Sequence, residues 1–185
     1  MDLSGKGAAL KLARVLVAGP LGAGKTTFIS TMCSDGVFIS TDRRVTSPVE
    51  RRIKEKTTVA FDYGCTCWNE IKLVFYGTPG QKRFFYFIPV LIKRCDYLVF
   101  MVDWSSPPSV YRGRALFERY FRPNLSRFRN FVVAVHEEDL PSPLTLADVA
   151  EILAVDRGRV VQSVATNRES CLLVVSKLLG LLLST

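Results

Sequence analysis

The chain has 185 residues, a formal net charge of +8 and a hydrophobic content of 48%. This length suits one domain with a sizeable core, residues 1–185, and the hydrophobic content excludes an intrinsically disordered chain. The basic balance is typical of a solvated arginine-rich surface, although it also suits phosphate groups, acidic proteins, nucleic acid or an anionic membrane. Composition alone favours none of these partners, and we expect no specific nucleic-acid binding.

The cysteines and the two termini indicate in which cellular compartment the protein is expected. Of the five cysteines only Cys65 and Cys67 lie close together, and no second pair completes a zinc site, so we expect reduced thiols. The N-terminus lacks a secretory signal, and Asp2 stands where a myristoylation signal needs glycine. Residues 171–185 are apolar but too short to span a bilayer, and they carry no prenylation box. We expect a cytoplasmic protein without a transmembrane segment or a lipid anchor.

Taken in chain order, the first predicted elements surround a glycine-rich loop. The apolar run at 12–18 predicts a buried strand, GPLGAGKT follows at 19–26, and an apolar period predicts a helix at 27–34. Residues 37–56 are polar and basic without a clear period, so they predict a long loop.

The rest of the chain alternates predicted strands and helices. The runs at 57–67 and 71–76 predict a hairpin, and further strands are expected at 97–103, 131–136 and 159–163. Helices are expected at 81–93, 109–121, 144–154 and from 168 onward. This order predicts a three-layer α/β fold, with a six-stranded, mostly parallel sheet in which the hairpin supplies one antiparallel strand.

The loop at 19–26 matches the pattern G-x-x-x-x-G-K-[ST] and has a strand before it and a helix after it. Its glycines allow backbone N–H groups to close around phosphate oxygens, and the helix N-terminus adds partial positive charge. Lys25 is expected to reach the β- and γ-phosphates and to stabilise charge during phosphoryl transfer, and the Thr26 hydroxyl to bind Mg²⁺. The nucleotide contacts expected from this part of the chain are Gly19, Leu21, Gly22, Ala23, Gly24, Lys25, Thr26 and Thr27.

With the motifs downstream, the chain resembles the Ras-like small GTPases. The resemblance is carried by GPLGAGKT, by a threonine at the start of the second predicted strand (Thr57 or Thr58), by GTPGQ at 77–81, and by VAVHEEDL at 133–140. Among prokaryotic members it looks most similar to the branch of gliding-motility GTPases and of small GTPases that work with Roadblock-type proteins. The resemblance implies the P-loop NTPase fold, with GTP, GDP and Mg²⁺ as ligands.

The resemblance also implies two switch segments, switch I at about 37–58 and switch II at about 77–93. Thr58 would bind Mg²⁺ and order switch I in the triphosphate state. Gly80 would donate its N–H to the γ-phosphate, and Gln81 would orient the attacking water. Loss of the γ-phosphate would then release both segments.

One acid that the resemblance implies is missing. The family usually has Asp, which holds Mg²⁺, where this chain has Gly77. Asp62 is the nearest replacement in the hairpin, and it lies four residues after Thr58, so both side chains point to one face of a strand. We expect Asp62 to support Mg²⁺ through water; the alternative is that it pairs with a basic surface group.

The base-reading motif is altered as well. The family has Asn-Lys-x-Asp, whereas this chain has His136, Glu137, Glu138 and Asp139. Asp139 is expected to accept from the guanine N1–H and N2–H₂ groups, a pairing that adenine cannot make. His136 would replace the Asn as a polar tether or would be an ordinary polar strand end, and the Ala165 N–H would contact the guanine O6.

The expected function is slow GTP hydrolysis by a molecular switch that binds guanine nucleotide and a protein effector or activator, with Roadblock-type proteins as a candidate class. An arginine that assists hydrolysis would come from a partner or from switch I, at Arg43, Arg44, Arg51 or Arg52, although each is more simply a solvated residue. The altered motifs leave open a nucleotide-binding scaffold with little or no hydrolysis. A small phosphotransferase is a third possibility, but it leaves GTPGQ unexplained.

Overall fold

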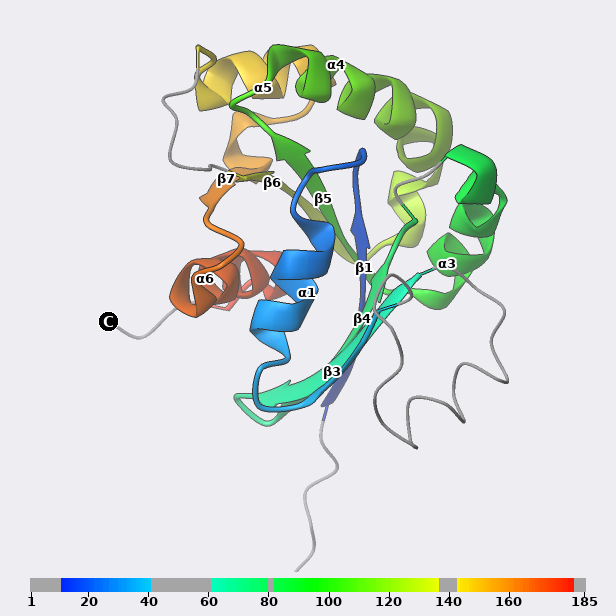
Figure 1. Ribbon diagram of the computed structural model, residues 1–185, viewed down its shortest axis with the longest axis vertical. Coiled ribbons are helices and arrows are strands. Elements are labelled where there is room, and N and C mark those ends of the chain that lie inside the picture. The colour runs from blue at the N-terminus through cyan, green and yellow to red at the C-terminus, as the bar shows by residue number, and fades with distance from the viewer. Residues whose placement is uncertain (1–10, 41–60, 80–81, 137–142, 182–185) are drawn as a thin grey trace, which may run out of the picture.

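The computed structural model describes residues 11–40, 61–79, 82–136 and 143–181. Within these residues the chain forms one seven-stranded sheet in the order β2-β3-β4-β1-β5-β6-β7 (Figure 1). The strands are β1 Lys11–Ala18, β2 Val37–Ile39, β3 Asp62–Trp68, β4 Ile71–Gly77, β5 Tyr97–Asp103, β6 Asn130–His136 and β7 Val160–Ser163. β3 runs antiparallel to both of its neighbours, and the other neighbouring pairs are parallel.

The strand count corrects the prediction of six strands and of a loop that begins at residue 37. Three residues of that segment, Val37–Ile39, form β2 and pair with β3 at the edge of the sheet. Such a run is too short to show an alternating pattern, and an edge strand needs only one neighbour, so the signal lies in the pairing and not in the local sequence.

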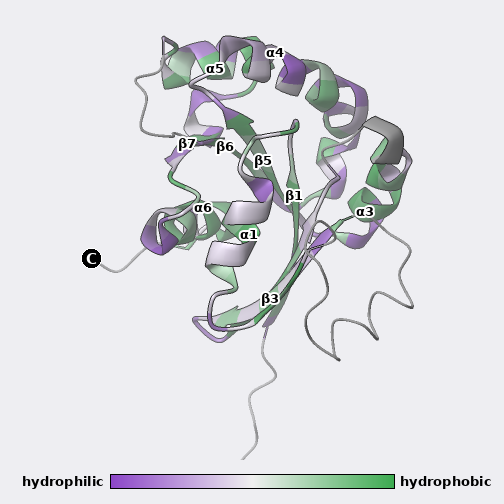
Figure 2. Cartoon of the chain, viewed as in Figure 1, coloured by the Kyte–Doolittle hydropathy of each residue, from purple (hydrophilic) through white to green (hydrophobic). Residues whose placement is uncertain are grey.

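Helices cover both faces of this sheet (Figure 1). They are α1 Lys25–Met32, α3 Ile88–Arg94, α4 Pro107–Leu116, α5 Leu146–Leu153 and α6 Arg168–Leu179. α1 and α6 bury apolar side chains on one face, and α3, α4 and α5 on the other. The central strands β1, β5 and β6 are hydrophobic along most of their length, as expected for strands covered on both sides (Figure 2). The prediction of an α/β fold is therefore confirmed.

Two predicted helices are less regular than expected. The helix at 81–93 is a 3₁₀-helix, Lys82–Phe87, that continues into α3, where Pro89 lies in the first turn. The helix at 109–121 changes from α4 to one π-helical turn, Phe117–Phe121, before the 3₁₀-helix Arg122–Arg127.

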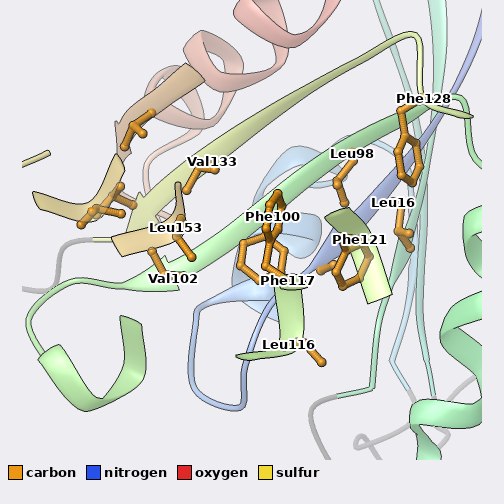
Figure 3. Close-up of a cluster of buried hydrophobic side chains, with 14 of the residues drawn as sticks. Leu16, Leu98, Phe100, Val102, Leu116, Phe117, Phe121, Phe128, Val133 and Leu153 are labelled. Atoms are coloured by element: carbon orange, nitrogen blue, oxygen red, sulfur yellow. The ribbon is translucent and has the colours of Figure 1, made fainter. Parts of the chain in front are cut away.

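The π-helical turn faces the core beside β5. Phe117 and Phe121 both pack against Phe100, with ring centroids 4.9 and 5.4 Å from it, and the three rings lie together in Figure 3. All three side chains are fully buried. We infer that this packing holds the wider turn in place, because it brings both rings onto one strand.

The topology collects strand ends from much of the chain at one edge of the sheet. The carboxyl ends of the parallel strands β1, β4, β5, β6 and β7 share this edge, and the antiparallel β3 begins there with Asp62. Ligands of open α/β sheets bind beyond this edge, so a ligand site is expected here. All five cysteines are free thiols. Among the described residues, no helix has the length and apolar character that a membrane crossing requires.

Candidate phosphate site

The loop at 19–26 joins the central strand β1 to α1 at this edge (Figure 1). Gly19 has a φ of +148°, and a Cβ there would lie 2.1 Å from the Met101 carbonyl oxygen, so only glycine fits beside β5. Gly24 has a φ of +80° and precedes the first residue of α1. The predicted loop conformation therefore depends on glycine at two positions where a side chain would be excluded or strained.

The N-terminus of α1 has no side-chain cap. Gly24 occupies the capping position and has no side chain that could accept a hydrogen bond from the first turn. The first N–H groups of a helix have no partner within the helix and carry partial positive charge. They are consequently available to an anion bound in the loop.

Lys25 is held over the loop by a backbone carbonyl. Its side chain is buried, and Nζ donates a hydrogen bond to the Pro20 carbonyl oxygen at 2.6 Å. Burial lowers the pKa of Lys25 from 10.5 to about 8, and the nearby Asp62 carboxylate partly opposes this shift. An anion in the loop would offer Lys25 a stronger partner than a neutral carbonyl does.

Thr26 and Asp62, both predicted magnesium residues, are brought together by the fold. The Thr26 hydroxyl donates to Oδ2 of Asp62 at 2.6 Å, although 36 residues separate the two. Asp62 is 8% exposed and lies directly opposite Gly77 in the β3–β4 ladder. A carboxylate from β3 thus lies beside the position of the missing acid on β4.

The geometry explains why residue 77 carries no side chain. A Cβ at Gly77 would lie 3.0 Å from the Cβ of Asp62 and 2.9 Å from Cδ1 of Ile29. Both contacts are closer than real Cβ atoms normally make. Asp62 and a side chain at position 77 therefore compete for one space, and this chain fills it from β3.

The donor set fits a hard divalent cation such as Mg²⁺. A hydroxyl has one hydrogen and two lone pairs, so Thr26 can donate to Asp62 and still offer an oxygen lone pair to a cation. The described residues contain no group of three His, Cys, Asp or Glu side chains suited to a metal ion. A cation here would rely on Thr26, on Asp62 and on oxygens of a bound phosphate or of water, as Mg²⁺ sites commonly do.

On the other side of the loop, His136 ends β6. Its ring packs against Gly24, and its Nδ1 lies 3.4 Å from both the Ala165 N–H nitrogen and the Ser163 carbonyl oxygen. Ala165, predicted to contact guanine, is fully buried, and its N–H is directed at His136. A base oxygen would have to share this N–H or replace His136 as its acceptor.

The other predicted residues fall into two groups. In the loop, Leu21 and Gly22 are exposed, Ala23 is buried in the core and Thr27 is half-buried, so Ala23 would contact a ligand through its backbone. The remaining predicted residues, Thr58, Gly80, Gln81 and Asp139, lie outside the described residues.

Thr78 is a further candidate residue that the sequence motifs did not indicate. Its N–H donates to the Val17 carbonyl oxygen at 2.8 Å and so attaches the end of β4 to β1. Its side chain is buried, and Oγ1 has no hydrogen-bond partner in the part of the chain that the structure describes. A buried hydroxyl without a partner is unusual and marks a contact that a ligand or water would satisfy. The sequence offers no signal for this, because the burial and hydrogen bonding of a single threonine side chain depend on tertiary contacts.

Comparisons with known proteins give only one distant match. No protein-family model matches it. A protein of the archaeon Methanocaldococcus jannaschii, described only as uncharacterized, is 27% identical over 92 residues. The match spans 50% of this chain and 51% of that protein, about half of each. Neither comparison assigns a family.

Proposed function

We propose that this chain is a small GTP-binding protein that hydrolyses GTP to GDP, with the fold of the Ras-like small GTPases, and that it acts as a nucleotide-dependent molecular switch. The observation that carries the proposal is the hydrogen bond between Thr26 and Asp62. It joins the hydroxyl of the phosphate loop to a buried carboxylate from a strand far along the chain. A role in folding alone gives no reason for a carboxylate at this buried position, because a buried charge is costly unless a partner stabilises it.

The loop residues bind the phosphates of the nucleotide. Backbone N–H groups at 19–26 and the uncapped start of α1 surround the phosphate oxygens. Lys25 leaves the Pro20 carbonyl and pairs with the β- and γ-phosphates. When bound, Mg²⁺ supplies positive charge that offsets the charge on these phosphates. Thr26 and Asp62 are the residues that would hold it.

The hairpin connects this site to the two switch segments. Asp62 and Gly77 are opposite each other in the ladder, so Phe61 and Thr78 continue from the same end of the hairpin, beside the phosphate loop. Switch I precedes this end and switch II follows it. In the proposal Thr58 and Gly80 respond to the γ-phosphate and Gln81 orients the attacking water. A protein effector or activator, with Roadblock-type proteins as a candidate class, then recognises the closed switches.

Guanine recognition is assigned to Asp139, together with His136 at the end of β6 and Ala165 just after β7. The test is a titration of GDP, GTP, ADP and ATP with and without Mg²⁺, combined with phosphate release in the same samples. We expect guanine nucleotides to bind at least about tenfold more tightly than adenine nucleotides, because the adenine edge leaves Asp139 unpaired. Equal binding of both bases would contradict the guanine assignment.

Phosphate release separates the switch from the scaffold alternative. We expect slow release from GTP that is lost in Gln81→Leu, whereas Gln162→Leu, an exposed residue on β7, retains it. Tight GTP binding without release in the wild type would instead support a nucleotide-binding scaffold.

A further inference from the structure

The edge of the sheet opposite the phosphate loop, where the parallel strands begin, is rich in basic side chains. β1 starts at this edge, at the foot of the view in Figure 1, and its other end reaches the phosphate loop. The Asp96 N–H donates to the Arg14 carbonyl oxygen, and the Arg129 N–H donates to the Asp96 carbonyl oxygen, both at 2.8 Å. Arg14, Asp96 and Arg129 therefore lie side by side across β1, β5 and β6, near the amino ends of these strands.

Three further segments add bases to the same edge. Lys93 and Arg94 are the last residues of α3, and Arg127 is the last residue of the 3₁₀-helix that packs beside α3. On β4, Lys72 is the register partner of Leu12 on β1. We call this surface the basic end. It consists of the exposed side chains of Arg14, Lys72, Lys93, Arg94, Arg127 and Arg129.

The basic end holds more positive than negative charge. Asp96 pairs with Arg14 at 3.0 Å, and Glu70 lies on the β3–β4 turn. Within the described residues, none of the other five bases of this surface forms an ion pair. Exposed like charges repel one another and create a positive field, which attracts an anionic partner.

An exposed leucine lies among these bases. Leu12 is 53% exposed. Two residues separate it from Arg14 along β1, so both side chains leave the same face of the sheet, where Lys72 is the neighbour of Leu12 on β4. Surfaces that lie on anionic bilayers combine basic residues with apolar side chains that enter the headgroup boundary.

We propose that the basic end docks this protein on an anionic phospholipid bilayer. Its bases come from two helix ends and from the starts of several strands, so they spread over one end of the molecule and do not follow a single line. A bilayer presents negative charge over a plane and can meet all of them at once. The phosphate loop, at the other end of β1, stays open to nucleotide. The inference goes beyond the proposed function and does not depend on it.

The experiment is cosedimentation of the full chain with vesicles of phosphatidylcholine, with or without about one-third phosphatidylserine. We expect binding only to the anionic vesicles, and its loss at about 0.5 M salt, where the screening length falls to a few Å. Each base near such a surface typically contributes about fivefold, so the double variant Arg94→Gln/Arg129→Gln should bind at least about tenfold more weakly. Both side chains are exposed, so the variant is expected to fold.

The matched control is Arg112→Gln/Arg114→Gln, which removes the same charge from exposed positions on α4. It should bind anionic vesicles nearly as well as the wild type. An equal loss in both double variants would show that net charge alone attracts the protein and would overturn the inference. Equal binding of the wild type to neutral and anionic vesicles would overturn it as well.

Competition separates a bilayer from other anionic partners. Vesicle binding should persist when duplex DNA or polyglutamate is added at an equal concentration of negative charge. Displacement by the DNA would assign the basic end to nucleic acid, and displacement by polyglutamate would assign it to an acidic protein; either result would overturn the inference.

Vesicle binding and nucleotide binding should vary independently. The Arg94→Gln/Arg129→Gln variant should keep the GDP affinity of the wild type, and Lys25→Ala should keep its vesicle binding. A wild type that binds anionic vesicles but no GDP would contradict the proposed function alone. A wild type that binds GDP but no vesicles would contradict the docking inference alone.

Discussion

The two sides of the candidate site differ in how firmly their unusual residues are held. On the proposed metal side, Asp62 lies opposite Gly77, where the family resemblance predicts an acid, and it accepts a 2.6 Å hydrogen bond from Thr26. On the base side, His136 makes contacts of 3.4 Å to two competing partners. The comparison indicates that the contacts proposed for phosphate and metal are fixed by the fold, whereas the proposed base side depends on a histidine whose hydrogen-bonding roles depend on its tautomer.

The largest effect is expected from Lys25→Ala, which tests the metal and phosphate side. Charge-assisted hydrogen bonds to phosphate are among the strongest in proteins, so nucleotide affinity should fall about 100-fold. The dissociation constant for GDP provides the measurement, and Lys177→Ala, at an exposed position on α6, is the matched control. If the two variants bound GDP equally well, the loop would not be a phosphate site.

The second prediction concerns the space that Asp62 and Gly77 share. Gly77→Ala should lower the free energy of unfolding by about 1–3 kcal/mol, because the new methyl group collides with Asp62 and Ile29. In the Asp62→Gly background, which removes the Cβ of residue 62, the same substitution should cost clearly less, a coupling that a double-mutant cycle by urea denaturation would measure. Additive effects would show that the two positions do not compete.

The third prediction uses the lowered pKa of Lys25. Without nucleotide, the pKa of Lys25 is about 8. Bound phosphate raises this pKa, because the negative phosphate favours the charged form of the amine. The complex then holds more protons than the empty protein above pH 8, so affinity should fall by up to about tenfold per pH unit as the pH rises through 8.

Titrations of GDP from pH 7 to 9.5 would check this fall. Lys25→Arg supplies the control, since an arginine stays charged throughout this range. Its affinity should be lower at pH 7 but flat, and a parallel fall in both proteins would assign the pH dependence to another group.

The smallest effect is expected on the base side, at Ser163. Its hydroxyl is buried and has no hydrogen-bond partner within the described residues, so Ser163→Ala should change the free energy of unfolding by less than about 0.5 kcal/mol. The carbonyl of residue 163, which faces His136, remains in this variant. A loss above about 1 kcal/mol in thermal or urea unfolding would reveal a contact of this hydroxyl beyond the described residues.

Sequence patterns predicted the loop and the strands better than the contacts between them. The strands at 97–103 and 131–136 were found because strands buried on both faces read as continuous apolar runs. The role of Asp62 as a nearby replacement acid was suggested by spacing along one strand. Its contact with Thr26 was not, because it depends on where α1 lies over the β3–β4 hairpin.

The base side shows the same limit. His136 was predicted as a polar tether or a polar strand end, but its link to Ala165 follows from the parallel register of β6 and β7, in which His136 pairs with Ser163. The irregular turn at Phe117–Phe121 likewise reflects packing on Phe100, a tertiary effect that local periodicity does not encode.

The most direct test of the account is the effect of Mg²⁺ on GDP affinity in the wild type and in Asp62→Ala. If Asp62 supplies the acid missing at Gly77, Mg²⁺ should strengthen binding to the wild type at least about tenfold and should have little effect on Asp62→Ala, since partners that support a metal site typically contribute a factor of 10–100. An Asp62→Ala protein that binds GDP with the full magnesium dependence of the wild type would contradict the account.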